Sequence, residues 1–145
     1  MSAGGVKLYT ADVLALATSL AQWPFDSAMP RIGMARSPSC GSTLTMSLST
    51  DEQGAIAAIG LAAQACAIGQ ASAALFAASA LGKAQADIVR AADALEAWLR
   101  HNGPMPDWPG LATLSVARDY PARHGAMMLP WRAAIEALSQ TVPAR

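Results

Sequence analysis

Residues 40–66 read CGSTLTMSLSTDEQGAIAAIGLAAQAC, and the only two cysteines of the chain are the first and last residues of this stretch. Over residues 43–49, hydroxyl side chains alternate with Leu44, Met46 and Leu48, which is the period of a strand with one buried face. Residues 51–54 supply a turn, and an apolar return segment follows it. The stretch therefore predicts a β-hairpin with strands near residues 42–50 and 55–62.

The pairing of the two strands decides where the two thiols lie. If Thr50 pairs with Ala55, Cys40 falls opposite Ala65, one residue short of Cys66. One β-bulge in the hairpin closes that gap, because a bulge inserts one extra residue on one strand. We therefore expect the two cysteines at the same end of the sheet.

Composition limits the classes of protein to consider. The chain has 145 residues, 53% of them apolar, which is typical of one globular domain, and its formal net charge is zero. Neither a nucleic-acid footprint nor a basic membrane patch is indicated. Residues 55–82 carry no charge, but this alanine-rich run is interrupted by polar side chains and fits a buried strand and helix better than a membrane span.

The location and organisation of the chain follow from its first part and its periodicity. No secretory signal pattern precedes the hairpin, so we expect a cytoplasmic protein in which both thiols stay reduced. We expect a loosely ordered tail over residues 1–7 and a single domain over 8–145. Pro130 is expected in the first turn of the last helix. The elements predicted outside the hairpin are a short edge strand over 30–35 and helices over 10–22, 66–81, 84–101, 111–116 and 127–140.

Four short sequence motifs follow one another along the chain in the order in which a known family carries them. They are SPSCGS at 37–42, ACAIGQASA at 65–73, Gly-Lys at 82–83 and YPAR at 120–123. In this order they resemble the NifU/IscU/SufU family of iron-sulfur cluster assembly scaffolds and sulfur acceptors, over about residues 8–138. The resemblance implies an α+β fold, with a small antiparallel sheet of about three strands and helices packed on one face.

The resemblance also implies a metal site, and this chain departs from it. Such scaffolds hold zinc or a nascent iron-sulfur cluster with three cysteines and an aspartate or a histidine. Cys40 and Cys66 match two of the cysteines, whereas Ser42 stands at the aspartate position and Ala126 at the third cysteine. His124, two residues before Ala126, is the remaining nearby donor. The predicted metal-site residues are therefore Cys40, Cys66 and His124, for an iron-sulfur cluster or zinc.

The sequence leaves several roles open for the two thiols. A homodimer would offer four thiolates to a 2Fe-2S cluster, or Cys40, Cys66 and His124 would hold one metal with an open position. The two thiols would also suit a thiol-disulfide couple, or act only as small buried apolar side chains. Because Cys66 is predicted near a helix N-terminus, we expect it to be the more acidic thiol if it is exposed.

The predicted function is that of a non-enzymatic iron-sulfur assembly scaffold-like protein or sulfur acceptor that works through Cys40 and Cys66. The resemblance implies a cysteine desulfurase as its partner. The alternative is a metal-free interaction or regulatory module that retains the fold without cluster chemistry. Asp51 and Glu52 are adjacent carboxylates, which suits acid-base chemistry, but their place in a turn favours solvated side chains.

Overall fold

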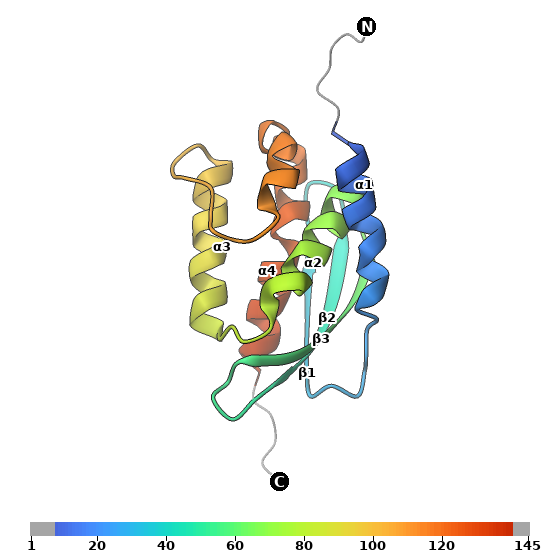
Figure 1. Cartoon of the computed structure of the whole chain (residues 1–145), viewed down its shortest axis with the longest axis vertical. Helices are drawn as coiled ribbons and strands as arrows, with labels where there is room; N and C mark the ends of the chain where they lie inside the picture. Colours follow the sequence, from blue (N-terminus) through green and yellow to red (C-terminus); the bar gives the residue numbers. More distant parts are fainter. Residues whose placement is uncertain (1–7, 141–145) are drawn as a thin grey trace, which may run out of the picture.

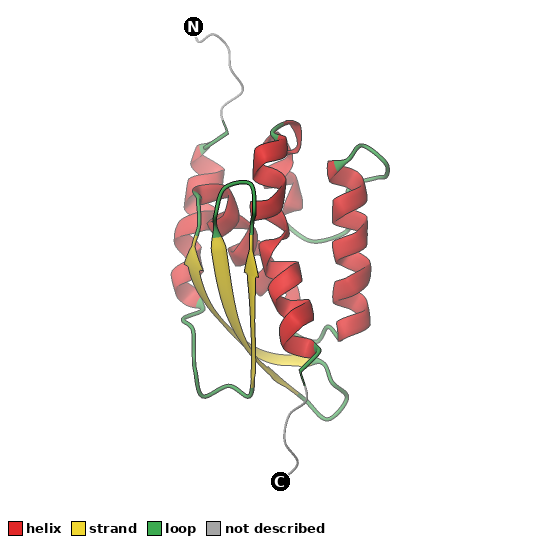
Figure 2. Cartoon of the chain, turned by 180° about the vertical axis from the view of Figure 1, so that it is seen from behind, coloured by secondary structure: helices red, strands yellow, loops and turns green. Residues whose placement is uncertain are grey.

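The computed structural model describes residues 8–140, so the tail predicted over residues 1–7 lies outside the described part of the chain. Three antiparallel strands form one sheet in the order β1 (Arg31–Arg36), β2 (Thr43–Thr50) and β3 (Ile56–Gln64). Helices cover one face of this sheet (Figures 1 and 2). The α+β architecture implied by the resemblance is confirmed.

The predicted helices are present, with some changes of boundary. Thr10 caps the first of them through a hydrogen bond from the Val13 N–H to its Oγ1 at 3.1 Å. The 3₁₀ segments extend or join the α-helices. The helical elements are α1 (Ala11–Thr18), η1 (Ser19–Gln22), α2 (Ala67–Ala80), α3 (Gln85–Leu99), η2 (Leu111–Asp119), η3 (Pro121–Arg123) and α4 (His124–Leu138).

The predicted hairpin is formed by β2 and β3, but its predicted pairing is wrong. Thr50 faces Ile56 instead of Ala55, and a register irregularity between Ser49 and Thr50 shifts the pairing by one further residue. Ser49 therefore faces Ala58. The sequence predicted that one irregularity would adjust the strands, and the structure places it beside the turn.

Side-chain hydrogen bonds in the turn explain the offset. The Asp51 carboxylate accepts hydrogen bonds from the N–H groups of Gln53 and Ala55, at 2.9 and 3.0 Å. Ala55 therefore belongs to the turn, which is longer than the simplest pairing assumes. Gly54 has a φ of +81°, a conformation that costs glycine little. Asp51 and Glu52 are exposed here, as expected for turn residues.

The last helix begins earlier than predicted, and Pro130 lies inside it. The predicted range was 127–140, with Pro130 in the first turn, whereas α4 starts at His124. The reason is that η3, opened by Pro121, runs directly into α4, and proline is well suited to open a helix. Since Pro130 has no N–H, the carbonyl of Ala126 receives no hydrogen bond from it.

α4 packs closely on β1 because Gly33 has no side chain. A Cβ at Gly33 would overlap the main chain of α4 at Ala133 and Ala137. Both alanines are buried, and their small size lets the helix backbone approach the strand. This contact places α4 across the sheet, so that the first turn of α4 lies at the same end of the molecule as the loop between β1 and β2 (Figure 1).

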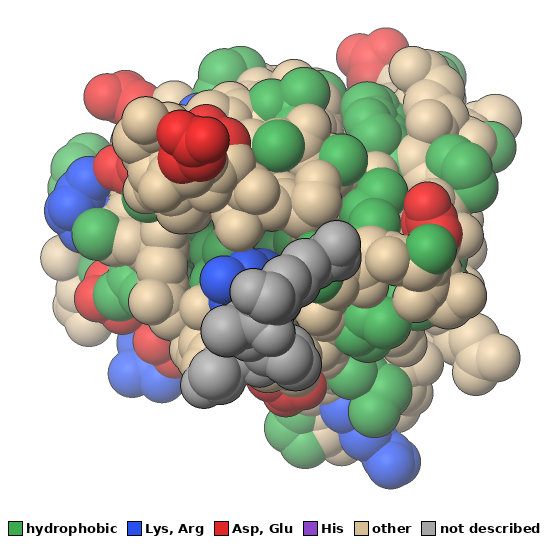
Figure 3. Space-filling model, turned by 90° about the horizontal axis from the view of Figure 1, so that it is seen from below, with side chains coloured by type: hydrophobic (Ala, Val, Ile, Leu, Met, Phe, Trp, Pro, Cys, Tyr) green, Lys and Arg blue, Asp and Glu red, His purple; other side chains and the backbone are tan. Residues whose placement is uncertain are grey.

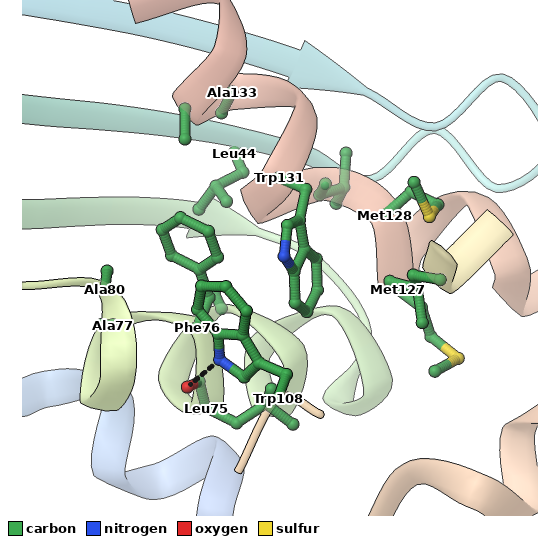
Figure 4. Packing of buried hydrophobic residues seen from close by; sticks show 14 of the residues in the cluster. Leu44, Leu75, Phe76, Ala77, Ala80, Trp108, Met127, Met128, Trp131 and Ala133 are labelled. Carbon is green, nitrogen blue, oxygen red and sulfur yellow. Dashed lines mark hydrogen bonds between the residues drawn. The ribbon is translucent and has the colours of Figure 1, made fainter. Parts of the chain in front are cut away.

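Three aromatic rings fill the core between the helices (Figure 4). Phe76 and Trp108 stack with centroids 5.1 Å apart, and Trp131 meets both rings edge-on, at 5.4 and 5.2 Å. The indole N–H of Trp108 donates to the carbonyl of Leu75 at 3.0 Å. Trp108 lies between α3 and η2, so this hydrogen bond ties that long connection to α2.

Main-chain donors at both edges of the sheet already have partners. At the β1 edge, the N–H of Met34 donates to the Glu136 carboxylate of α4 at 3.1 Å. At the β3 edge, the N–H of Leu61 donates to the carbonyl of Trp23 at 2.8 Å. A side chain of α4 and the segment after η1 thus occupy these two positions, where a further strand would pair.

None of the helices described within residues 8–140 has the length and apolar character needed to cross a bilayer. The uncharged run over residues 55–82 is divided between β3 and α2, as predicted. On the face shown in Figure 3, Lys and Arg side chains are scattered among Asp, Glu and apolar side chains. No continuous area of one charge sign is visible on that face, which agrees with the zero net charge.

Candidate functional site

The loop that carries Cys40, residues 37–42, is closed by its own main chain. The N–H of Ser37 donates to the carbonyl of Ser42, and the N–H of Gly41 donates to the carbonyl of Ser37, both at 2.8 Å. Gly41 has a φ of +73°, which a residue with a side chain rarely adopts. The loop therefore holds Cys40 in a fixed place at the end of the sheet.

Ser42 connects the two cysteines. Its Oγ lies 3.1 Å from the Sγ of Cys40 and accepts a hydrogen bond from the N–H of Cys66 at 3.4 Å. Cys66 is the residue that precedes α2 and is half-buried, whereas Cys40 is exposed. Ser42 itself is only 5% exposed. The structure thus brings the two cysteine residues to one hydroxyl group, at one end of the sheet.

Hydrogen bonds lower the pKa of the Cys40 thiol from its ordinary value. The largest cause is the Ser37 hydroxyl, 3.4 Å from the Cys40 Sγ, and the Ser42 hydroxyl follows; partial burial acts in the opposite direction. The positive charge of Arg123 lowers the pKa of Cys40 by a smaller amount. Both hydroxyls can rotate to donate to a thiolate. Cys40 therefore combines exposure to solvent with two hydroxyl partners for its thiolate.

The sequence predicted a different thiol, Cys66, as the more acidic of the two. The prediction favoured Cys66 because of its place at a helix N-terminus, on the condition that it is exposed. The structure finds Cys66 half-buried and gives Cys40 both the greater exposure and the two hydroxyl partners. The order of acidity of the two thiols stays a prediction.

The first turn of α4 and the preceding η3 close the other side of the site. The Oγ of Ser39 donates to the carbonyl of Ala122 at 3.0 Å. Gly125 lies against Ser37 so closely that a Cβ at Gly125 would overlap the Ser37 side chain. The loop over residues 37–42 is therefore packed against η3 and the start of α4.

Ala126 lies on the inner wall of the site, next to α2. It is fully buried, and a Cβ built at Gly69 would lie 3.5 Å from the Cβ of Ala126. Gly69 belongs to the first turn of α2, three residues after Cys66. The position that the resemblance assigns to a third cysteine thus lies against the first turn of α2, which Cys66 precedes, and it carries only a methyl group.

The His124 ring is engaged elsewhere. Its Nε2 lies 2.7 Å from the carbonyl oxygen of Arg118, and the residue lines a cavity of about 200 Å³ between α3 and α4. Within residues 8–140, no three His, Cys, Asp or Glu side chains are grouped so that they could hold a metal ion. Metal binding by Cys40, Cys66 and His124 together stays a prediction, and the present positions of the side chains do not favour it.

Two residues that act on Cys40 were not singled out from the sequence. Ser37 and Arg123 both lie in short motifs that carry the resemblance, at residues 37–42 and 120–123, but neither was given a role. Their effect on the thiol depends on the closure of the loop and on the docking of η3, which no local pattern reveals.

Comparisons with known proteins agree with this geometry. No protein-family model and no curated protein matches the chain. Among solved structures, it is similar to a nitrogen-fixing NifU-like protein (N-terminal) from Brucella abortus, with 27% identity and a TM-score of 0.82 over 90% of this chain and 92% of that chain. The chain has a NifU/IscU/SufU-type fold.

Two further structures share the fold of this NifU-type chain. A putative iron-sulfur cluster assembly scaffold protein for the SUF system from Fervidobacterium islandicum AW-1 is 19% identical, covers 94% of this chain and 100% of its own, and has a TM-score of 0.81. A hypothetical protein is 21% identical over 88% of this chain and 97% of its own, with a TM-score of 0.66. At these identities the likeness concerns the fold alone.

Proposed function

We propose that this NifU-type chain serves iron-sulfur cluster assembly as a sulfur acceptor, and that Cys40 receives sulfur from a cysteine desulfurase. The observation that carries the proposal is the exposed Cys40 thiol between the hydroxyls of Ser37 and Ser42, which lower its pKa. Attack on a sulfur-sulfur bond needs an accessible thiolate. The chain acts as a stoichiometric carrier in a reducing cytoplasm, and not as an enzyme.

The donor set of the site supports sulfur transfer over metal holding by a single chain. A zinc site normally has four ligands, or three and a water. Cys40 and Cys66 supply two thiolates, Ser42 supplies a neutral hydroxyl, and Ala126 supplies no donor. An iron-sulfur cluster is cargo in this proposal, and it would need the four thiolates of two chains.

The test is to load the protein with sulfur and locate it. Protein is incubated without oxygen with a cysteine desulfurase and free cysteine, desalted, and examined by intact and peptide mass spectrometry. The Cys66→Ser variant, whose only thiol is Cys40, should gain one sulfur atom on Cys40. The matched Cys40→Ser variant should gain none. If Cys40 gains no sulfur, the proposal fails and the metal-free interaction module becomes the better interpretation.

A further inference from the structure

The thiol of Cys66 has no role in the proposed loading of sulfur on Cys40. Cys66 is the only other thiol in the sequence, and it lies in the same site as Cys40. Ala126 offers no donor beside it, and the His124 ring is bonded to the Arg118 carbonyl. The Cys66 thiol is thus not committed to a ligand set, and a use for it must come from its place beside Cys40.

The ends of the hairpin strands bring the two residues together. Thr43 faces Gln64 at the last pair of β2 and β3, so Ser42 and Ala65 come next on the two chains. Facing residues on antiparallel strands have Cα atoms about 4.5–5.5 Å apart, and a disulfide spans Cα distances of about 4.4–6.8 Å. Ser42 Oγ lies within hydrogen-bond distance of both the Cys40 Sγ and the Cys66 N–H, so both cysteine residues border Ser42.

We propose that Cys66 is the resolving thiol of the site: it attacks the persulfide carried on Cys40, releases the carried sulfur as sulfide, and leaves a Cys40–Cys66 disulfide. This inference rests on the proposed function, because it begins from sulfur bound to Cys40. It adds a reductive step that the chain performs with its own two thiols.

The step balances in atoms and electrons. The Cys66 thiolate forms a bond to the Cys40 sulfur, and the bond between the Cys40 sulfur and the carried sulfur breaks. The electron pair leaves with the carried sulfur as hydrosulfide, which is thereby reduced by two electrons while the two cysteine sulfurs are oxidised to a disulfide. The proton of the Cys66 thiol passes to solvent. An external dithiol reductant then restores the two thiols.

The experiment follows one turnover after loading. Protein loaded by a cysteine desulfurase and desalted without oxygen is incubated, and released sulfide and free thiols are measured over time. Wild type should release one sulfide per loaded chain and yield a peptide pair linked through Cys40 and Cys66. The Cys66→Ser variant should keep its persulfide, with sulfide release slower by about tenfold or more, since its attacking thiolate is absent.

Controls separate the two proposals. Wild type that has never met the sulfur donor should keep both thiols, which excludes stray oxidation as the source of the disulfide. Equal rates of sulfide release from wild type and Cys66→Ser, or a lasting persulfide beside a free Cys66, would overturn the resolving role while leaving sulfur acceptance intact. Failure of Cys66→Ser to load at all would overturn sulfur acceptance, and the resolving role with it.

Discussion

The residue at position 42 changes the chemistry of the cysteine beside it. By the resemblance, an aspartate belongs where Ser42 stands, and a carboxylate next to Cys40 would disfavour a thiolate through like-charge repulsion. The Ser42 hydroxyl does the opposite, because it can donate a hydrogen bond to the thiolate and so contributes to the lowered pKa of Cys40. The same exchange that removes a metal ligand therefore favours a nucleophilic thiol.

Removing a hydroxyl partner should raise the pKa of Cys40. In a Cys66→Ser background, Ser37→Ala and Ser42→Ala should each move the midpoint of the alkylation rate against pH to higher pH, so that reaction at neutral pH becomes slower. The sign follows because hydrogen bonds to the thiolate lower the pKa, and their loss returns it toward its ordinary value. Mass spectrometry after iodoacetamide pulses gives the rate.

The matched control is Ser115→Ala, which removes an exposed hydroxyl bonded to the Ala112 carbonyl of η2. Its midpoint should equal that of the background protein. If neither site serine moves the midpoint, the lowered pKa of Cys40 has another cause and the reactive-thiol argument loses its basis.

At the scale of helices and strands, the local sequence pattern predicted which elements form, but not the register of the hairpin or the start of α4. Alternation of hydroxyl and apolar residues predicted β2, and the turn residues predicted the hairpin. The register depended on Asp51, whose carboxylate binds two N–H groups inside the turn. The start of α4 depended on η3, a 3₁₀ turn that has no clear sequence period. Side-chain hydrogen bonds and short helical turns are what the pattern could not resolve.

The site shows the same division. The resemblance assigned Cys40, Cys66 and Ala126 to one site, and the structure brings Ser42 to both cysteine residues and Ala126 against the first turn of α2. The orientation of the His124 ring could not be predicted from the sequence. It depends on the Arg118 carbonyl, which η2 presents from another part of the fold.

The contact between α4 and β1 should tolerate no side chain at position 33. Gly33→Ala should lower the free energy of unfolding by about 1–3 kcal/mol, because its Cβ overlaps the main chain of α4 and the helix must move. Denaturant titration followed by circular dichroism measures the change. Met34→Ala on the same strand, whose side chain is exposed, should change stability by no more than about 0.5 kcal/mol. Similar stabilities for wild type and Gly33→Ala would show that α4 does not pack on β1 so closely.

For the molecule as a whole, the site joins three distant parts of the chain. The loop over residues 37–42, the start of α2 and the start of α4 meet there through the contacts of Ser42, Gly125 and Ala126. A metal ion held by all three parts would bind only the folded chain and would therefore raise its stability.

Restoring the two missing ligands should create such a metal site. The Ser42→Asp/Ala126→Cys double variant should bind zinc far more tightly than wild type, because it adds a carboxylate and a third thiolate to Cys40 and Cys66. At a free zinc concentration 100 times the dissociation constant, the gain in stability should be about 2.7 kcal/mol. Zinc titration and thermal unfolding with and without zinc measure both effects.

The matched control moves the new cysteine to α3. Ser42→Asp/Ala97→Cys carries the same added groups, but Ala97 lies on α3 beside the connection to η2. It should show no comparable gain in zinc affinity. If the Ala126→Cys double variant binds zinc no better than this control, Ala126 does not occupy the third-ligand position.

The covered edges of the sheet limit how two copies of the chain can meet. Because the N–H groups of Met34 and Leu61 are already bonded, a second copy gains little by extending the sheet across a pair. Two copies that pool their thiols would face each other at the thiol end, each presenting the loop over residues 37–42. Such a pair would enclose Cys40, which the proposed desulfurase partner would also have to reach. Sulfur loading and pairing of copies then compete for one surface and exclude each other in time.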